Sequence, residues 1–500
     1  MSSDQPTSNS RVEEISCDLC ILGAGIAGLN ALFVASRYLS PSNRVVLVDR
    51  RAAVGGMWLS TYDYVRLHQP HPLFTAGNIP WTFGKERGHL ATGAEVLSHL
   101  RHCFETLRAQ VTVEERFGCE YQSHEEIGGE AGDVIVRCAS REGKPLRIRA
   151  KKLVKALGHD VKTKKPLALS SRRVESISPD QQDLLGKVAG AASVYIVGGG
   201  KTAMDTAYAI VTRFPEKPVS LLIGRGTLFL RRDDVFPTGA RRLWGGVTPV
   251  AAFLDVGRRF DGSNEGEVLD YFRSRYALSL VPDARRWMFA LLSDHENAVI
   301  ASGVREVIRD YLVDVVDRDG RPTMLSRSGA SRPIEPGSLI VNCTGYLFLD
   351  AIPYEPFVSP SGKVVAIHSA SALHFNTAWA TYFATHLSYL NLLHRLPLFE
   401  IDLVSLYRAN PEMLAPALGS QILHNTSLIL RAAPRSVFGD CGVDVERWYP
   451  PHRQLLDGLS FLWFIKHHPD HFRHALDVIR DRFGVRCGPL PHVARASASN

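Results

Sequence analysis

The chain has 500 residues, of which 45% are hydrophobic and 22% charged, a composition typical of globular proteins and not of disordered or fibrous ones. The net charge of +7 is spread along the chain without clustering, which argues against a nucleic-acid partner, and eight cysteines are too few for a disulfide scaffold. The apolar runs are too short to span a bilayer and the start of the chain is polar, so a cytoplasmic location without a transmembrane segment is expected.

The first folded segment is predicted to be a strand–turn–helix–strand unit. Residues 1–15 are expected to form a disordered tail, and the apolar run that follows predicts a strand ending at Leu22. The glycine-rich turn 23–28, a helix over 29–39 and a strand over 45–49 complete the unit. Such a unit is right-handed and parallel by strong default. Cys17 and Cys20 have the spacing of a redox pair, but they lie inside the predicted strand and are interpreted as buried structural thiols.

The turn has the GxGxxG pattern that binds dinucleotides. Its small residues allow a tight turn and let the backbone approach a pyrophosphate, and the following helix presents free N–H groups. Asp49 lies 21 residues after Gly28, where a carboxylate accepts ribose hydroxyls. The glycine pair that follows allows a flat ligand to pass close to the backbone. The residues predicted to bind the first nucleotide here are Gly23, Ala24, Gly25, Ile26, Ala27, Gly28, Asp49, Arg50, Gly56, Met57 and Trp58.

A second copy of the pattern begins 175 residues later, with a strand over 193–197 and the turn 198–203. Its second strand ends without an acidic residue and is followed by Arg225, with Arg231 nearby. An arginine pairs with a 2′-phosphate, whereas a carboxylate would repel it, so this site is predicted to prefer NADP over NAD. The residues predicted to bind the second nucleotide are Gly198, Gly200, Lys201, Thr202, Ala203, Arg225 and Arg231.

Further elements are predicted from apolar patterns. A hairpin is expected from strands near 134–138 and 146–150, and helices near 265–276, 284–295 and within 370–395. A strand running into a small-residue turn is expected over 339–345. The apolar stretch Leu459–Ile465 is interpreted as part of a core helix, with a partner-facing patch as the alternative.

The motifs GAGIAG, VLVDR, GGMW and VRLHQP together resemble the class B flavin-dependent monooxygenases. These are the flavin-containing monooxygenases, the YUCCA-like enzymes, the Baeyer–Villiger enzymes and the N-hydroxylating monooxygenases. The resemblance implies FAD on the first glycine unit and NADPH on the second, with His68 and Gln69 near the flavin ring. The segment after Val341 resembles the family's return segment, which places Thr344 and Gly345 beside FAD.

The implied fold is α/β, with two Rossmann-like dinucleotide-binding domains, the second inserted in the first. The FAD domain is expected to comprise 16–165 and 335–395. The NADP domain is expected to comprise 190–334 with an Arg-rich insertion at 226–300. The remaining residues, 396–500, are expected to form a C-terminal cap.

The implied reaction transfers one oxygen atom from O₂ to a small organic substrate through a C4a-(hydro)peroxyflavin. The interval 158–192 lacks the fingerprint that Baeyer–Villiger members carry, so oxygenation at nitrogen or sulfur is favoured. Baeyer–Villiger oxygenation, an NADPH-dependent flavin oxidoreductase or oxidase, and a non-catalytic nucleotide-binding protein remain as alternatives. No metal site and no catalytic side chain is predicted, and a homodimer is left open.

Overall fold

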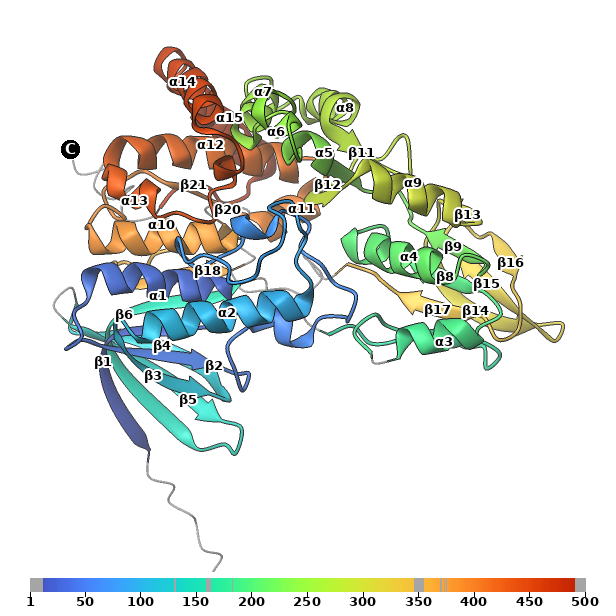
Figure 1. Ribbon diagram of the computed structural model, residues 1–500, viewed down its shortest axis with the longest axis horizontal. Coiled ribbons are helices and arrows are strands. Elements are labelled where there is room, and N and C mark those ends of the chain that lie inside the picture. The colour runs from blue at the N-terminus through green and yellow to red at the C-terminus, as the bar shows by residue number, and fades with distance from the viewer. Residues whose placement is uncertain are drawn as a thin grey trace, which may run out of the picture.

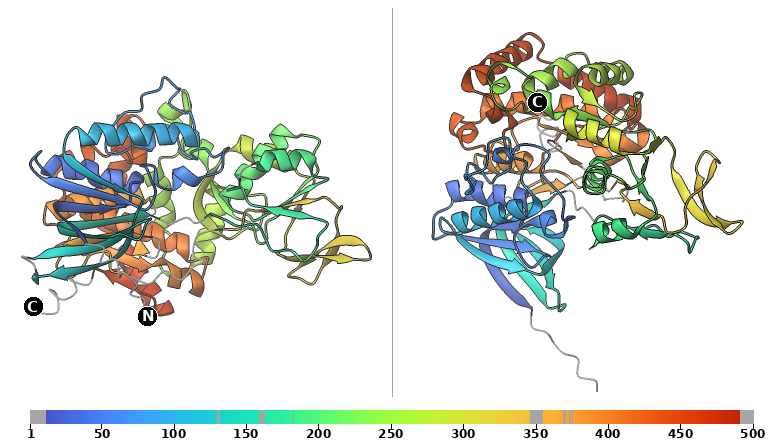
Figure 2. Two further views of the ribbon diagram at one scale, coloured as in Figure 1. Left: turned by 90° about the horizontal axis from the view of Figure 1, so that it is seen from below. Right: turned by 45° about the vertical axis from the view of Figure 1, so that its right-hand side comes forward.

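The computed structural model describes residues 12–490 except 130–131, 159–162, 182, 346–354, 369–370, 373 and 375. It is a mixed α/β structure with parallel sheets of the Rossmann type, as predicted. Figures 1 and 2 show two separate sheets, with most of the C-terminal helices lying on the far side of the first sheet's helices. Among the described residues, no helix is both long and apolar enough to cross a membrane.

The first sheet has seven strands in the order β3-β2-β1-β6-β5-β4, with β18 also paired to β6. The strands are β1 (Glu13–Leu22), β2 (Arg44–Asp49), β3 (Thr112–Phe117), β4 (Cys119–Ile127), β5 (Asp133–Ser140), β6 (Pro145–Gly158) and β18 (Val364–His368). The strands β3, β2, β1, β6 and β18 are parallel, whereas β4 pairs antiparallel with β5 and β5 with β6. The hairpin predicted from 134–138 and 146–150 is confirmed by β5 and β6. The helices α1 (Ile26–Tyr38), α2 (Gly93–Arg108) and α10 (Thr377–Tyr389) cover one face of this sheet (Figure 1).

The second sheet is wholly parallel, in the order β13-β9-β8-β17-β7. Its strands are β7 (Glu175–Ile177), β8 (Val194–Val197), β9 (Val219–Leu222), β13 (Glu306–Ile308) and β17 (Leu339–Asn342). The helices beside it are α3 (Leu184–Gly190), α4 (Lys201–Arg213) and α9 (Asp294–Gly303). The three central strands are fully buried, as expected for a parallel sheet that is covered on both faces.

The other elements form small sheets and a helical layer. The strands are β10 (Leu228–Arg231), β11 (Ala277–Leu278), β12 (Trp287–Leu292), β14 (Leu312–Arg318), β15 (Arg321–Ser326), β16 (Ser331–Pro333), β19 (Ser371–Ala372), β20 (Phe399–Asp402) and β21 (Cys487–Pro489). The helices are α5 (Arg232–Val235), α6 (Arg241–Trp244), α7 (Pro249–Gly257), α8 (Glu265–Tyr276), α11 (Leu403–Ala409), α12 (Leu414–Ala432), α13 (Arg435–Gly439), α14 (Pro451–His467) and α15 (His471–Phe483), and the 3₁₀ turns are η1 (Gly56–Ser60), η2 (His71–Leu73) and η4 (Val445–Trp448).

Several boundaries differ from the sequence expectations. β1 begins at Glu13, so the predicted tail 1–15 is too long at its end, and residues 1–11 lie outside the described part. The helix predicted near 284–295 is wrong, because Trp287–Leu292 pairs as a strand with β10 before α9 begins. The predicted helices over 265–276 and within 370–395 are confirmed by α8 and α10. The segment 226–300, expected within the second unit, instead packs α7 and α8 against the C-terminal α12.

The strand β17 lies in the second sheet, between β8 and β7, and not in the first unit, where its residues are expected from the sequence. The strand β7 also belongs to the second sheet, although it precedes residue 190, the expected start of the second unit. β17 is to β8 what β6 is to β1: each lies parallel beside the strand that leads into a glycine turn. An apolar run that is buried on both faces carries no sequence signal for which of two parallel sheets it joins.

Two glycines of the second turn provide a matched test of this packing. Gly198 has φ +134°, and a Cβ built on it lies 2.2 Å from the carbonyl oxygen of Cys343, which follows β17. Gly200 has negative φ and no atom within 4 Å of such a Cβ. Gly198→Ala should therefore destabilise the protein by about 1–3 kcal/mol, whereas Gly200→Ala should cost less than about 1 kcal/mol. Thermal unfolding of the two variants checks this, and equal melting temperatures would contradict it.

Candidate functional site

A cavity of about 800 Å³ lies where three parts of the chain meet. One wall is the edge of the first sheet, at the carboxyl ends of β1, β2 and β6. A second wall includes the first turns of α4, through Lys201 and Asp205, and a third comes from α7, α11, α12 and the η4 region. Ligands of open parallel sheets bind at the carboxyl ends of the strands, so this is the position where a nucleotide-linked reaction would be expected.

At the first glycine turn, main-chain atoms that carry no side chain line the cavity. Gly23 has φ +106°, and a Cβ on Gly28 would lie 1.7 Å from the Gly23 carbonyl oxygen, so both positions require glycine. Gly25 caps α1 without a side-chain hydrogen bond, and the first turn of that helix has no acidic residue. Gly56, with φ +56°, packs so closely on Gly25 that a Cβ on Gly56 would lie 2.8 Å from the Gly25 Cα. The turn therefore presents uncapped N–H groups and a positive helix end to the cavity.

Asp49 fastens this turn to the end of β2. One carboxylate oxygen accepts a hydrogen bond from the N–H of Ala24 (2.7 Å), and the other accepts one from the N–H of Arg51 (2.7 Å). The side chain is buried and still lines the cavity. Asp49 thus holds the turn in shape in addition to the ribose-binding role that its position predicts.

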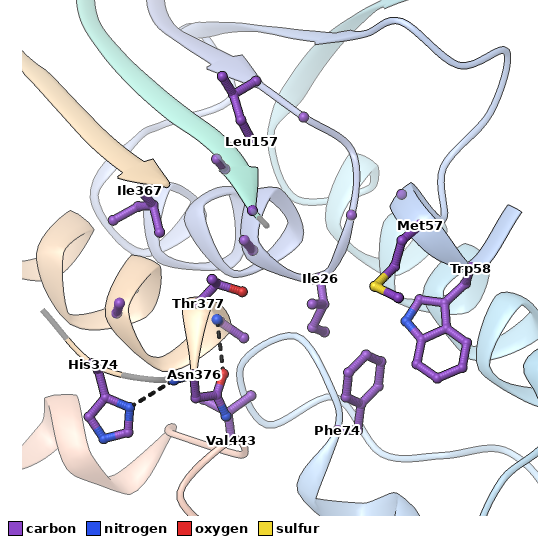
Figure 3. A pocket seen from close by; sticks show the side chains of 18 of the residues that line it. Ile26, Met57, Trp58, Phe74, Leu157, Ile367, His374, Asn376, Thr377 and Val443 are labelled. Carbon is purple, nitrogen blue, oxygen red and sulfur yellow. Dashed lines mark hydrogen bonds between the residues drawn. The ribbon is translucent and has the colours of Figure 1, made fainter. Parts of the chain in front are cut away.

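The N-terminal end of α10 faces the same cavity from the other side of α1 (Figure 3). The side-chain oxygen of Asn376 accepts hydrogen bonds from the N–H groups of Ala378 (3.0 Å) and Trp379 (3.2 Å), which defines the helix start. Opposite, Trp58 lies edge-on to Phe74 with ring centres 5.6 Å apart. In Figure 3, Met57, Trp58 and Phe74 lie on one side of Ile26, and Thr377 lies on the other.

His68 is held as a neutral donor. Its Nδ1 accepts a hydrogen bond from the N–H of Leu291 (3.3 Å), so in the neutral ring the proton resides on Nε2. Burial, with Lys201 and Arg232 nearby, lowers the pKa of His68 to about 3. Burial likewise lowers the pKa of His374, another cavity residue, to about 3. Both imidazoles are therefore uncharged at neutral pH.

Gln69 presents an acceptor without a partner. Its Oε1 atom is buried and makes no hydrogen bond with any described residue, although the residue lines the cavity. A buried amide oxygen left unpaired costs about 1–3 kcal/mol. A ligand that donates a hydrogen bond at this point would remove that cost.

The sequence did not identify a polar cluster that joins the two units. Tyr62, which precedes the predicted VRLHQP segment, donates a hydrogen bond from its hydroxyl to Asp205 (2.9 Å), and Lys201 forms an ion pair with the same carboxylate. Burial raises the pKa of Asp205. The i, i+4 spacing of Lys201 and Asp205 was visible in the sequence, but Tyr62 is 143 residues from Asp205 and no local pattern connects them.

The wall opposite the glycine turn is apolar. It consists of Leu230, Val235, Phe236, Pro249, Phe253, Phe289, Leu291, Leu403, Leu414, Leu418, Val443 and Val445. These residues come from segments spread over more than two hundred positions, so no local pattern predicts that they meet. The wall contains no ionisable side chain, and it is suited to an uncharged organic molecule.

The predicted site residues separate into two groups. Those that line the cavity are Gly23, Gly25, Ile26, Ala27, Asp49, Arg50, Gly56, Met57, Trp58, His68, Gln69 and Lys201. Those outside its lining are Ala24, Gly28, Thr344, Gly345, Gly198, Gly200, Thr202, Ala203, Arg225 and Arg231. Thr344 follows β17 and bonds to the Asn342 side chain, so it lies beside the second turn and not, as expected, beside the first.

The second turn resembles the first in geometry. Gly200 caps α4 without a side-chain bond, and the first turn of this helix also has no acidic residue. Arg225 follows β9, is exposed, and forms no ion pair within the described residues. Arg231, in contrast, forms ion pairs with Asp234 (3.5 Å) and Asp294 (3.3 Å). Of the two predicted arginines, Arg225 is therefore the one with its charge available.

Comparison with known proteins agrees with this arrangement. Residues 17–236 match the family described as pyridine nucleotide-disulphide oxidoreductase. The family implies binding of FAD and of NAD(P)H.

An uncharacterised protein of Mycobacterium tuberculosis is 24% identical over 364 residues, which cover 68% of this chain and 62% of the relative. The chain thus spans less than two thirds of that relative's length. Among solved structures, a flavin-containing monooxygenase from Stenotrophomonas maltophilia is 15% identical with a TM-score of 0.47, covering 75% of this chain and 98% of that one. A bacillithiol disulfide reductase from Staphylococcus aureus is 12% identical with a TM-score of 0.44, covering 76% and 99%.

The lowered pKa of His68 leads to a prediction about pH. Because this pKa lies below the ordinary value of 6.5, the unfolded chain binds a proton more readily than the folded chain at mildly acidic pH. Stability should therefore fall as the pH decreases from about 6.5 towards about 3. His68→Gln, which keeps an acceptor for the Leu291 N–H, should lose less stability between about pH 7 and about pH 5 than the parent protein. Melting temperatures at both pH values measure this, and equal losses would show that His68 is not held neutral.

Proposed function

We propose that the chain is an FAD- and NADPH-dependent monooxygenase that inserts one oxygen atom from O₂ at nitrogen or sulfur of a small organic substrate. The observation that carries the proposal is the cavity itself, which joins a dinucleotide-binding glycine turn to an apolar wall. Bound FAD would supply hydride acceptance from NADPH and reaction with O₂, and the chain's own residues supply position and water exclusion.

The residues at the first turn fit FAD. The uncapped end of α1 suits a pyrophosphate, and close packing of Gly25 on Gly56 keeps side chains away from it. The unpartnered Oε1 of Gln69 suits an N–H of a flavin ring, and the start of α10 suits an oxygen of that ring. Neutral His68 can donate a hydrogen bond from Nε2 without introducing a charge into the cavity.

The cysteines and the apolar wall of the cavity support oxygenation and not a thiol–disulfide exchange reaction. Cys119 is the only described cysteine that lines the cavity, so no pair of thiols meets there in the described part of the chain. Cys17 and Cys20 are buried in β1, and burial raises the pKa of Cys17 to about 12 and that of Cys20 well above its usual value. Such thiols are poor nucleophiles. An apolar wall, on the other hand, excludes water from a reactive oxygen species.

The choice of NADPH depends on Arg225, which is exposed beside the second turn and forms no ion pair with any described residue. A charge-assisted contact with a 2′-phosphate contributes about 1.5–3 kcal/mol, or about ten- to a hundredfold in affinity. Arg225→Ala should weaken binding of NADPH by that factor and leave NADH nearly unaffected. Arg231→Ala is the matched control, because Arg231 already pairs with Asp234 and Asp294. Titration of both nucleotides measures the effect, and an equal loss for NADPH and NADH would reject this assignment.

The reaction type is tested by supplying isotopically labelled O₂ and NADPH with a thioether, a secondary amine and a cyclic ketone. The purified protein should be yellow and should yield an S- or N-oxide carrying one labelled oxygen. A lactone as the dominant product would replace the proposal with Baeyer–Villiger oxygenation. NADPH consumption that releases only H₂O₂ would indicate an oxidase.

A further inference from the structure

Helix α14 exposes a row of large apolar side chains. Leu455, Leu456, Leu459, Leu462 and Trp463 are 45–64% exposed and recur with helical spacing, so they form one face. The opposite face is anchored by Phe461 and Ile465, which are buried against α7 and the C-terminal helices. Figures 1 and 2 show α14 at the outer edge of the molecule, away from both parallel sheets.

This arrangement overturns the interpretation of Leu459–Ile465 as a core segment. Only Phe461 and Ile465 of that stretch are buried. An apolar stretch of helix predicts burial, but the local sequence does not show that α14 packs against the protein on one side only.

The exposed face continues onto α6. His452, at the start of α14, bonds to the carbonyl of Leu243 (3.2 Å), and Arg453 bonds to the carbonyl of Gly246 (3.1 Å). Leu243 is exposed, and Trp244 beside it is 76% exposed. We call the exposed residues of α14 together with Leu243 and Trp244 the outer patch. Monomeric proteins rarely leave so many large apolar side chains in contact with water without an interaction partner.

The outer patch is bordered by positive charge. Arg241 is exposed beside Trp244 and lies 3.9 Å from a carboxylate oxygen of Asp234. Lys466 and His467 are exposed at the far end of α14, and the exposed Asp470 beyond them pairs with Arg473. The helix, which is described throughout, contains one acidic residue, Asp457. Its carboxylate accepts a hydrogen bond from Thr248 on the inner side (2.8 Å) and is not among the exposed residues. The exposed face of α14 therefore consists of apolar residues, one serine, one lysine and two histidines.

From these features we propose that the outer patch binds the surface of an anionic lipid bilayer, with α14 lying in the plane of the interface. Leucine and tryptophan on one helix face with basic residues at its borders are the composition of helices that insert at the headgroup level. Basic residues add attraction to anionic lipids. The inference stands apart from the proposed function, because it rests on the surface and not on the cavity.

A second copy of the chain fits the outer patch less well. A two-fold contact places the same surface against itself, so the end with Arg241 would meet either its own equivalent or the end with Lys466. Both arrangements bring cation against cation, which opposes association. The charge pattern is complementary to an anionic surface and not to itself.

The patch is rigidly connected to the body of the protein. Thr248 caps α7 and bonds to Asp457 of α14, and Glu446 of η4 accepts a hydrogen bond from the N–H of Val250 (2.6 Å). The neighbouring Pro249 and Val445 line the cavity. A bilayer bound at α14 would therefore lie against the same helical layer that forms the apolar wall.

Vesicle sedimentation tests the proposal on the full-length protein. The protein should bind vesicles made of an equimolar mixture of phosphatidylcholine and phosphatidylglycerol, and it should bind vesicles of phosphatidylcholine alone much less. High salt should release it from the mixed vesicles. The double variant Leu459→Glu, Leu462→Glu should bind at least about tenfold less, because it places charge where apolar insertion is required. Its melting temperature should be unchanged, because both side chains are exposed.

Val313→Glu is the matched control, since Val313 is 63% exposed on β14, at the opposite end of the molecule (Figure 1). It should bind vesicles like the parent protein. Absence of binding by the parent, or equal binding by the double variant, would overturn the proposal. A dimer in light-scattering measurements that the double variant dissociates would assign the patch to a second copy and overturn it as well.

Discussion

The parallel strands of both sheets depend on the same close contact between a glycine and a neighbouring strand. Gly23 donates its N–H to the Val48 carbonyl (2.7 Å) and packs against the Ala156 carbonyl at the end of β6. Gly198 donates to the Leu222 carbonyl (2.8 Å) and packs against the Cys343 carbonyl after β17. In each case three parallel strands converge on one residue with positive φ, which only glycine adopts at low cost. This contact sets the start of α1 and of α4, whose first residues are not capped by a side chain.

The cavity takes its chemical character from the way these two units meet. The first unit contributes bare backbone and uncapped N–H groups, and the second contributes Lys201 and Asp205, which are tied to Tyr62 of the first unit. Its imidazoles are kept neutral by burial, and its outer wall is apolar. The site therefore combines hydrogen-bonding groups at fixed positions with uncharged imidazoles and an apolar wall. Such a site suits a cofactor that performs the chemistry itself.

The C-terminal helices have two faces with different roles. Residues of α11 and α12 close the cavity, whereas α14 turns its leucines outward. The segment with α7 and α8 joins this layer and not the second sheet, and it thereby links the cavity wall to the outer patch. A segment inserted between two strands of the second sheet, β9 and β13, thus connects the cavity wall to the outer patch.

By itself the sequence determined the two dinucleotide-binding units, because glycine spacing, strand periodicity and the position of Asp49 are local properties of the chain. It also located most of the residues of the first turn that line the cavity, from Gly23 to Trp58, together with His68 and Gln69. Only the tertiary structure decided that β17 belongs to the second sheet, that Tyr62 meets Asp205, and that the apolar wall forms. It alone decided which side of α14 remains exposed. These features depend on contacts between residues far apart in the chain, and burial on a given face depends on what packs there, which no local pattern specifies.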